Sequence, residues 1–316
     1  MRSVKSLFVS AAVACAAFAS AQASPRQDKS VPGKDAARAQ AVKDLIASIE
    51  AKQQRIHNLR LTLEFRGSLP SNGGGKALEL RALMRLESRR DGNAKVGWSR
   101  LDVDLDTPQG PLRTEKLRTP DGIRIHLASE FTGERWLRMD RSTMHRLDRA
   151  AEVFGSTGAL QSAGGGRSGS VVGADLLRGL SRSYDLEVGK PMTLDDVRCI
   201  PVTATLTKPH DSKFDMPTQR PDKVLLYFAE SDRLLRKMIQ IQGGKTISTV
   251  TLRDVEIDPE IPKDRFVLRA PRGVRFTDIL TDKMASVRIR MDLRRLDAWE
   301  AEQRKKKAPE NASGRK

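Results

Sequence analysis

Cysteine, histidine and aromatic residues are all scarce in this chain, and each scarcity excludes a class of site. There are 2 cysteines in 316 residues, so neither a disulfide framework nor a cysteine-rich metal cluster is expected. Cys199, beside Ile200 and Val202, is expected to be a buried structural thiol. The 4 histidines do not pair at metal-ligand spacing, and 4% aromatic content provides few stacking platforms for single-stranded nucleic acid. We therefore expect no metal, no cofactor and no nucleic acid.

Catalytic motifs are missing as well. Residues 164–169 (GGGRSG) formally match G-x-G-x-x-G, but no strand leads into them, so a flexible loop explains the glycines. Asp102, Asp104 and Asp106 recur at every second position and line one face of a strand. They could bind a cation, although a solvated face opposite neighbouring arginines is the favoured interpretation. Nothing supports an enzyme; an exported enzyme without a recognisable motif remains one alternative.

The N-terminal residues predict export to the periplasm. Residues 1–23 combine Arg2 and Lys5 with an apolar run and a small-residue exit, as in a secretory signal peptide cleaved after Ala23. A competing interpretation makes Cys15 a lipidated N-terminus, because the residues before it loosely resemble a lipobox. Cleavage after Ala23 is favoured because its site matches better.

Positive charge predominates, with 57 Lys+Arg against 40 Asp+Glu and a formal net charge of +17. Such a field favours anionic partners, among them lipid headgroups, acidic proteins and nucleic acid. Export argues against nucleic acid, and a general solubility charge is the alternative. Residues 281–316 are expected to form a basic C-terminal helix and tail with an apolar stripe of Leu293, Leu296 and Trp299. This segment could dock on the sheet, contact an anionic membrane surface or be solvated.

Alternating patterns predict an antiparallel sheet in the first half of the chain. A polar linker (24–34) precedes a helix expected from residue 35 to about residue 58. Apolar and charged side chains then alternate over four segments, 59–65, 78–86, 101–105 and 123–127. Each predicted strand therefore has one apolar and one charged face, as in a sheet that packs on one side only.

The stretch 222–278 predicts a further antiparallel meander. Val224, Leu226 and Phe228 alternate in its first strand, and strands over 233–241 and 246–257 follow, separated by turn residues. A last short strand is expected over 266–268.

The same stretch contains a distinctive set of residues: Tyr227, Phe228, Leu234, Leu235, Arg236, Val255, Asp264, Phe266, Pro271, Gly273, Val274 and Asp278. With these residues it resembles the LolA/LolB family of outer-membrane lipoprotein-sorting proteins (lipoprotein carriers) and relatives such as the RseB sensor. The opening helix and the strand with Leu63 and Phe65 are similar to the family's start. The resemblance spans roughly residues 36–280 and implies one α+β domain over 35–280. Its sheet would be a strongly curved antiparallel half-barrel, with helices covering the concave apolar face.

The resemblance also implies a ligand site, because in the family the concave face is an apolar cavity that shelters acyl chains. The candidate cavity residues are Leu61, Leu63, Phe65, Leu80, Met84, Leu86, Leu101, Val103, Val224, Leu226 and Phe228. A glycine- and serine-rich loop (155–173), expected to be mobile, precedes a short helix over 174–180 whose Leu176, Leu177 and Leu180 would form a lid. Arg100 is a possible lid latch, although the proline that accompanies such an arginine in the family is absent. An ordinary filled core is the alternative for each of these apolar residues.

These observations predict a periplasmic, non-catalytic carrier for an acyl lipid or a lipoprotein. Its partners would be an inner-membrane donor and an outer-membrane acceptor, and the basic tail could add an anionic membrane surface. An RseB-like envelope sensor or interaction protein that reads lipoproteins is the leading alternative.

Overall fold

The structure is a computed structural model that describes residues 34–69, 78–90, 97–107, 110–130, 133–154, 173–181, 183–207, 221–283 and 285–307. The predicted signal peptide with Cys15, all but the last residue of the linker, and the glycine-rich loop up to residue 172 lie outside these residues. Predictions about them stay predictions.

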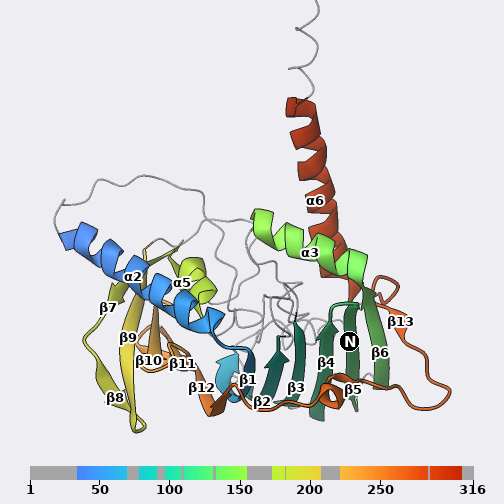
Figure 1. Cartoon of the computed structure of the whole chain (residues 1–316), viewed down its shortest axis with the longest axis horizontal. Coiled ribbons are helices and arrows are strands. Elements are labelled where there is room, and N and C mark those ends of the chain that lie inside the picture. Colours follow the sequence, from blue (N-terminus) through green and yellow to red (C-terminus); the bar gives the residue numbers. More distant parts are fainter. Residues whose placement is uncertain are drawn as a thin grey trace, which may run out of the picture.

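A large sheet and the helices on one of its faces make up the described chain (Figure 1). Its strands are β1 (Asn58–Leu69), β2 (Leu78–Arg89), β3 (Trp98–Thr107), β4 (Gly110–Thr119), β5 (Gly122–Ser129), β6 (Gly133–Asp140), β7 (Tyr184–Val188), β8 (Met192–Leu194), β9 (Val197–Leu206), β10 (Lys223–Ala229), β11 (Leu235–Gln242), β12 (Lys245–Ile257) and β13 (Thr277–Asp278). Its helices are α2 (Lys34–Gln54), α3 (Arg141–Phe154), α5 (Ala174–Leu180) and α6 (Ser286–Lys307), with a 3-10 turn η2 (Lys263–Phe266).

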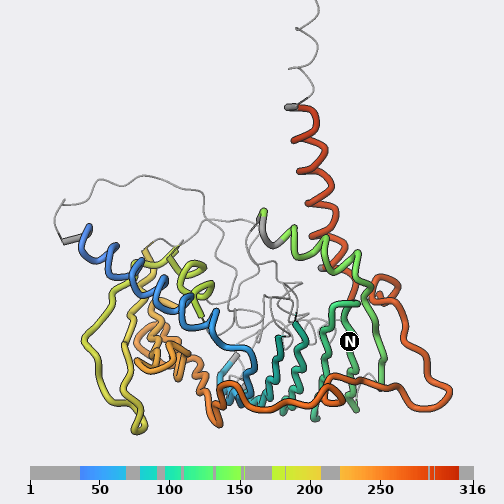
Figure 2. The backbone as a smooth tube through the Cα atoms, in the orientation of Figure 1, coloured from blue at the N-terminus to red at the C-terminus, as the bar shows by residue number. Residues whose placement is uncertain are grey.

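The sheet is open and curved, with the strand order β13-β6-β5-β4-β3-β2-β1-β12-β11-β10-β9-β7 and β8 paired to β9. Neighbours are antiparallel except for β13, which runs parallel to β6. Pairing of β1 with β12 joins the two meanders, which come from distant parts of the sequence. The strands curve beneath α2, α5 and α3 (Figures 1 and 2). The predicted α+β fold, an open curved sheet with helices on its concave face, is confirmed.

Most predicted strands are present, and one is wrong. The segments predicted as strands correspond to β1, β2, β3, β5, β10, β11 and β12. The strand predicted over 266–268 is absent, because Phe266 ends η2 and no ladder includes Val267 or Leu268. Phe266 and Leu268 are instead buried beside Leu117 and Ile261. Their alternation therefore reflects side-chain packing on the outer face of the sheet, and not a strand.

Strands β4, β6, β7, β8, β9 and β13 and helix α3 were not predicted from the sequence. In β4 the buried side chains of Lys116 and Arg118 occupy the apolar face, so hydrophobic alternation is lost. The start of helix α3 could have been predicted from its N-cap residue, Asp140. The Asp140 carboxylate accepts a hydrogen bond from the backbone N–H of Thr143 at 2.7 Å, as an N-cap does. This bond, with one from the Ser142 hydroxyl, lowers the pKa of Asp140.

Two hydrophobic clusters lie on the concave face and a third lies on the convex face. The larger concave cluster packs α2 and α5 against β1, β2, β7 and β9–β12. The smaller one packs α3 and the start of α6 against β5 and β6. Ile289 and Leu293 of α6 belong to it, so the basic C-terminal helix docks onto the domain along its first half. None of the described helices is both long and apolar enough to span a membrane.

Candidate ligand-binding face

Strand register brings the predicted cavity residues of β1, β2 and β3 onto one face. Two rows cross these strands, Leu61–Leu86–Leu101 and Leu63–Met84–Val103. Residues directly opposite one another in adjacent strands point to the same side of a sheet. The concave face is therefore apolar across β1–β3, as the alternation predicted.

A filled core occupies one part of this face. Seven of the predicted cavity residues are buried in the larger concave cluster: Leu61, Leu63, Phe65, Leu80, Val224, Leu226 and Phe228. Leu45 and Ile49 of α2 lie in the same cluster. These residues hold α2 and α5 on the sheet, so the alternative of an ordinary core describes them best.

The predicted lid helix α5 is part of that packing. Leu176 and Leu177 are buried in the larger cluster, and Leu180 is half-buried against it. Arg178 forms an ion pair with Glu50 of α2 at 2.5 Å, and its hydrogen bond to Glu50 raises the pKa of the guanidinium. Helix α5 is therefore held by α2 as well as by the sheet.

The middle of the concave face is packed less completely. Leu101 and Val103 of β3 are half-buried and belong to neither concave cluster. Met84 and Leu86 of β2 are half-buried at the margin of the larger cluster. We call the concave residues Met84, Leu86, Leu101, Val103, Thr114 and Lys116 the central strip. It lies between the part of the sheet that α2 covers and the part that α3 covers (Figure 1).

Lys116 is the unusual member of the central strip. It lies opposite Leu101 of β3 and Ile125 of β5, and only 4% of the residue is exposed. Its Nζ has no hydrogen-bond partner among the residues that the structure describes. Burial, and secondarily the nearby charge of Arg118, lowers the pKa of Lys116 well below 10.5. Most other residues of the central strip are apolar, so no polar motif in the sequence points to this amine.

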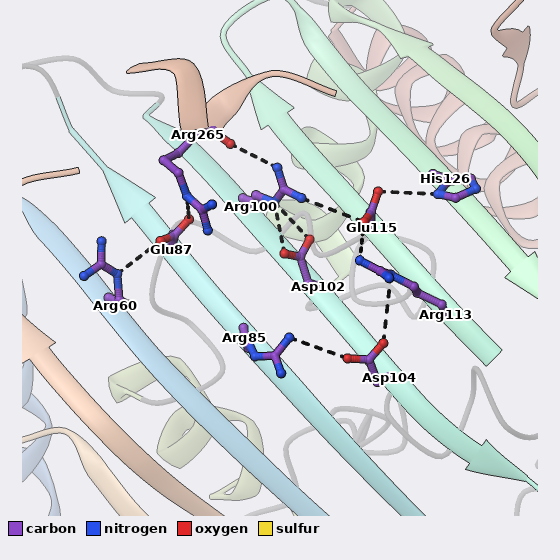
Figure 3. Close-up of polar contacts among 10 residues, drawn as sticks. All are labelled: Arg60, Arg85, Glu87, Arg100, Asp102, Asp104, Arg113, Glu115, His126 and Arg265. Atoms are coloured by element: carbon purple, nitrogen blue, oxygen red, sulfur yellow. Dashed lines mark hydrogen bonds and ion pairs between the residues drawn. The ribbon is translucent and has the colours of Figure 1, made fainter. Parts of the chain in front are cut away.

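Arg100, the predicted lid latch, lies on the opposite face of β3. Its guanidinium bonds Asp102 at 3.0 Å, lies 3.9 Å from Glu115 and donates to the carbonyl of Arg265 at 3.3 Å (Figure 3). Helix α5 packs on the concave face, whereas these contacts lie on the convex face. These contacts favour a role for Arg100 in attaching η2 to the convex face of the sheet.

The rest of the convex face is a network of paired charges. Asp104 lies 3.7 Å from Arg85 and 4.0 Å from Arg113 (Figure 3). Glu87 bonds Arg60 and Arg265, each at 3.1 Å. The prediction that the aspartates of β3 face arginines is confirmed for Asp102 and Asp104. Within the described ranges, no group of three His, Cys, Asp or Glu side chains could hold a metal ion.

Two shallow hollows lie beside this network. One is lined by Arg60, Leu61, Thr62, Arg85, Glu87, Arg100, Asp102 and Arg265, and the other by His57, Asn58, Arg89, Arg90, Glu260, Ile261 and Pro262. Both linings are rich in charge and do not suit an acyl chain. Neither hollow is the apolar cavity predicted from the sequence.

Cys199 is fully buried in β9, as expected. Burial raises the pKa of its thiol. A buried, protonated thiol is a poor nucleophile, which fits a structural role.

Comparisons with known proteins return solved structures only. No protein-family model and no curated protein matches this chain. One match is to a chain of the Pseudomonas aeruginosa MucA/MucB complex, with 9% sequence identity and a TM-score of 0.39. The match covers 72% of this chain and 61% of the matched chain. A second match is to Mycobacterium tuberculosis lipoprotein LppX, with 12% sequence identity and a TM-score of 0.35. The match covers 70% of this chain and 98% of LppX.

A third match is to a putative outer membrane lipoprotein-sorting protein domain from Vibrio parahaemolyticus, with 10% sequence identity and a TM-score of 0.31. The match covers 72% of this chain and 97% of that domain. This chain thus spans about three fifths of the MucB chain. The matched structures include the class that the sequence resemblance names. Their TM-scores all lie below 0.4.

Proposed function

We propose that this protein is a periplasmic, non-catalytic carrier that binds the acyl chains of a lipid or lipoprotein on the concave face of its sheet. The observation that supports the proposal is the central strip. Its apolar residues, Leu101 and Val103 above all, are half-buried between two well-packed helical clusters. A surface of this kind can bury further hydrocarbon without unfolding either cluster.

The energetics favour a purely physical mechanism. Burial of hydrocarbon contributes about 0.8 kcal/mol per methylene, so a chain of about sixteen carbons contributes on the order of ten kcal/mol before ordering costs. Uptake and release then require no covalent step, because affinity changes when the covering groups move. Helix α5, held by Leu177 and by the Arg178–Glu50 ion pair, is the element whose displacement would enlarge the apolar surface.

The test is native mass spectrometry, with lipid extraction, of the mature protein purified from the periplasm. A co-purifying acyl lipid or lipoprotein supports the carrier, and its headgroup separates lipid shuttling from lipoprotein sorting. A clean unliganded mass that does not change with added palmitate or a lipopeptide contradicts it. The concave face would then be a filled core, and the basic surface would be the place to seek a protein partner.

A paired substitution localises the binding. Val103→Glu puts a carboxylate into the central strip and should abolish palmitate binding. Val274→Glu makes the same change at a position that is 44% exposed outside the strip, and it should bind as the wild type does. Equal loss in both variants would place the ligand elsewhere. Circular dichroism of each variant checks that it folds.

A further inference from the structure

Lys116 differs from two arginines that lie on the same face of the described sheet. Arg118 lies two residues along β4, and its guanidinium bonds Asp148 of α3 at 2.8 Å. Arg135 of β6 lies opposite Leu127 and is 3.3 Å from Asp282. Each arginine has a carboxylate partner, whereas Lys116 has no ion-pair or hydrogen-bond partner among the described residues.

An isolated amine is costly at this position. Burial of a charge without a partner is strongly unfavourable, and a buried lysine without a partner adapts by losing its proton. The facing groups do not relieve the cost, because Leu101 and Ile125 are apolar and Arg118 carries a like charge. A methionine or leucine would fill the same space without the free-energy cost of a buried amine. An anionic group brought into the strip by a ligand would remove the penalty.

We infer that Lys116 receives the acidic group, a carboxylate or a phosphate, of an amphiphile whose hydrocarbon lies along the central strip. The inference rests on the proposed function, because the strip supplies the apolar surface and Lys116 supplies the polar end. Nη1 of Arg118 is buried and has no hydrogen-bond partner in the described chain, whereas Nη2 bonds Asp148. Nη1 can therefore donate to the same group. The site therefore favours anionic over neutral amphiphiles of equal chain length.

Binding of four ligands to the full mature protein tests the inference by calorimetry. Palmitate and hexadecyl phosphate carry the chain with a carboxylate or a phosphate, and methyl palmitate carries the chain without charge. Inorganic phosphate carries the charge without a chain. Wild-type protein should bind the two anionic amphiphiles at least about tenfold more tightly than the ester. It should not bind inorganic phosphate at the same concentrations.

Lys116→Met retains the volume of the side chain and removes the amine. It should lower the affinity for the two anionic amphiphiles to that for the ester, and the affinity for the ester should not change. Lys223→Met is the matched control. It removes one positive charge at an exposed position of β10 and should behave as wild type. If both variants lose the preference equally, the preference comes from the net positive charge and the inference is wrong.

The outcomes separate this inference from the proposed function. If wild type binds palmitate and its ester equally, or if Lys116→Met retains the preference for palmitate, only the inference is wrong. Tight binding of inorganic phosphate alone would also overturn it, because the site would then take a free anion. If neither palmitate nor its ester binds wild type, the carrier proposal fails together with the inference.

A spectroscopic readout shows the contact directly in wild-type protein. The nitrogen resonance of the Lys116 side chain reports its protonation. Palmitate should raise the pKa of Lys116 and shift that resonance, and methyl palmitate should not. An identical Lys116 resonance with and without bound palmitate would overturn the inference.

Discussion

The two faces of β3 and β4 differ because one charged side chain of the concave face, Lys116, has no carboxylate partner among the described residues. On the convex face, Arg100 pairs with Asp102 along β3, Arg113 pairs with Glu115 along β4, and Arg100 also lies 3.9 Å from Glu115 across the two strands (Figure 3). On the concave face, Lys116 is buried among apolar neighbours without such a partner. A network that pairs its own charges is complete without a ligand. The unpaired amine marks the concave face as the surface to which a ligand can contribute.

The largest expected effect concerns the core on the concave face. Leu226→Ala removes a side chain that is fully buried in the larger cluster, and should lower the free energy of unfolding by about 2–5 kcal/mol. Asp104→Ala on the convex face should cost less than about 1 kcal/mol, because its ion pairs are long and exposed. Urea denaturation measures both. Similar costs would mean that the concave core is loosely packed.

A smaller loss is expected where α3 joins the sheet. Asp148→Asn removes the carboxylate from Arg118, whose side chain is 9% exposed, and should cost about 2 kcal/mol because a buried cation is left unpaired. The control is Glu300→Gln, which breaks the more exposed Arg149–Glu300 pair between α3 and α6 and should cost under about 1 kcal/mol. Equal effects in urea denaturation would contradict the burial argument.

Lys116→Met should have the opposite sign and stabilise the unliganded protein by about 1–2 kcal/mol near neutral pH. Burial holds the pKa of Lys116 in the folded protein below its value in the unfolded chain. Between those two pKa values the unfolded chain binds more protons, so wild-type stability rises with pH. The advantage of the variant should therefore shrink as the pH is raised toward 10.5.

Thermal unfolding of both proteins at about pH 7 and about pH 9.5 measures this change. A constant difference between the two would mean that folding does not lower the pKa of Lys116. Lys223→Met provides the baseline for general charge effects.

A small effect is expected at Arg100. Arg100→Gln should cost about 1 kcal/mol, because the guanidinium shares its partly buried carboxylate partners with other cations. Palmitate affinity should not change, since Arg100 lies on the face opposite the central strip. A clear loss of palmitate affinity would revive the role of a lid latch, and titration calorimetry decides the matter.

Local patterns predicted much of the fold and little of the polar chemistry of the site. Alternation in β1, β2, β3 and β10 identified the strands and the residues of the apolar face. It failed at β4, where Lys116 and Arg118 interrupt the hydrophobic pattern of the concave face. It also misled at Phe266 and Leu268, whose two-residue spacing arises from packing against Leu117. Spacing reports which residues share a side, but it does not identify the surface they contact.

The sequence by itself determined that this protein builds a sheet with one apolar and one charged face, because side chains alternate along every strand whatever the partner strand is. Only the tertiary structure decided which residues of the apolar face became core and which remained half-buried. It joined β1 to β12, placed α2 and α5 over one part and α3 over another, and put Lys116 between Leu101 and Ile125. These results depend on pairings between residues far apart in the chain, which local alternation cannot specify.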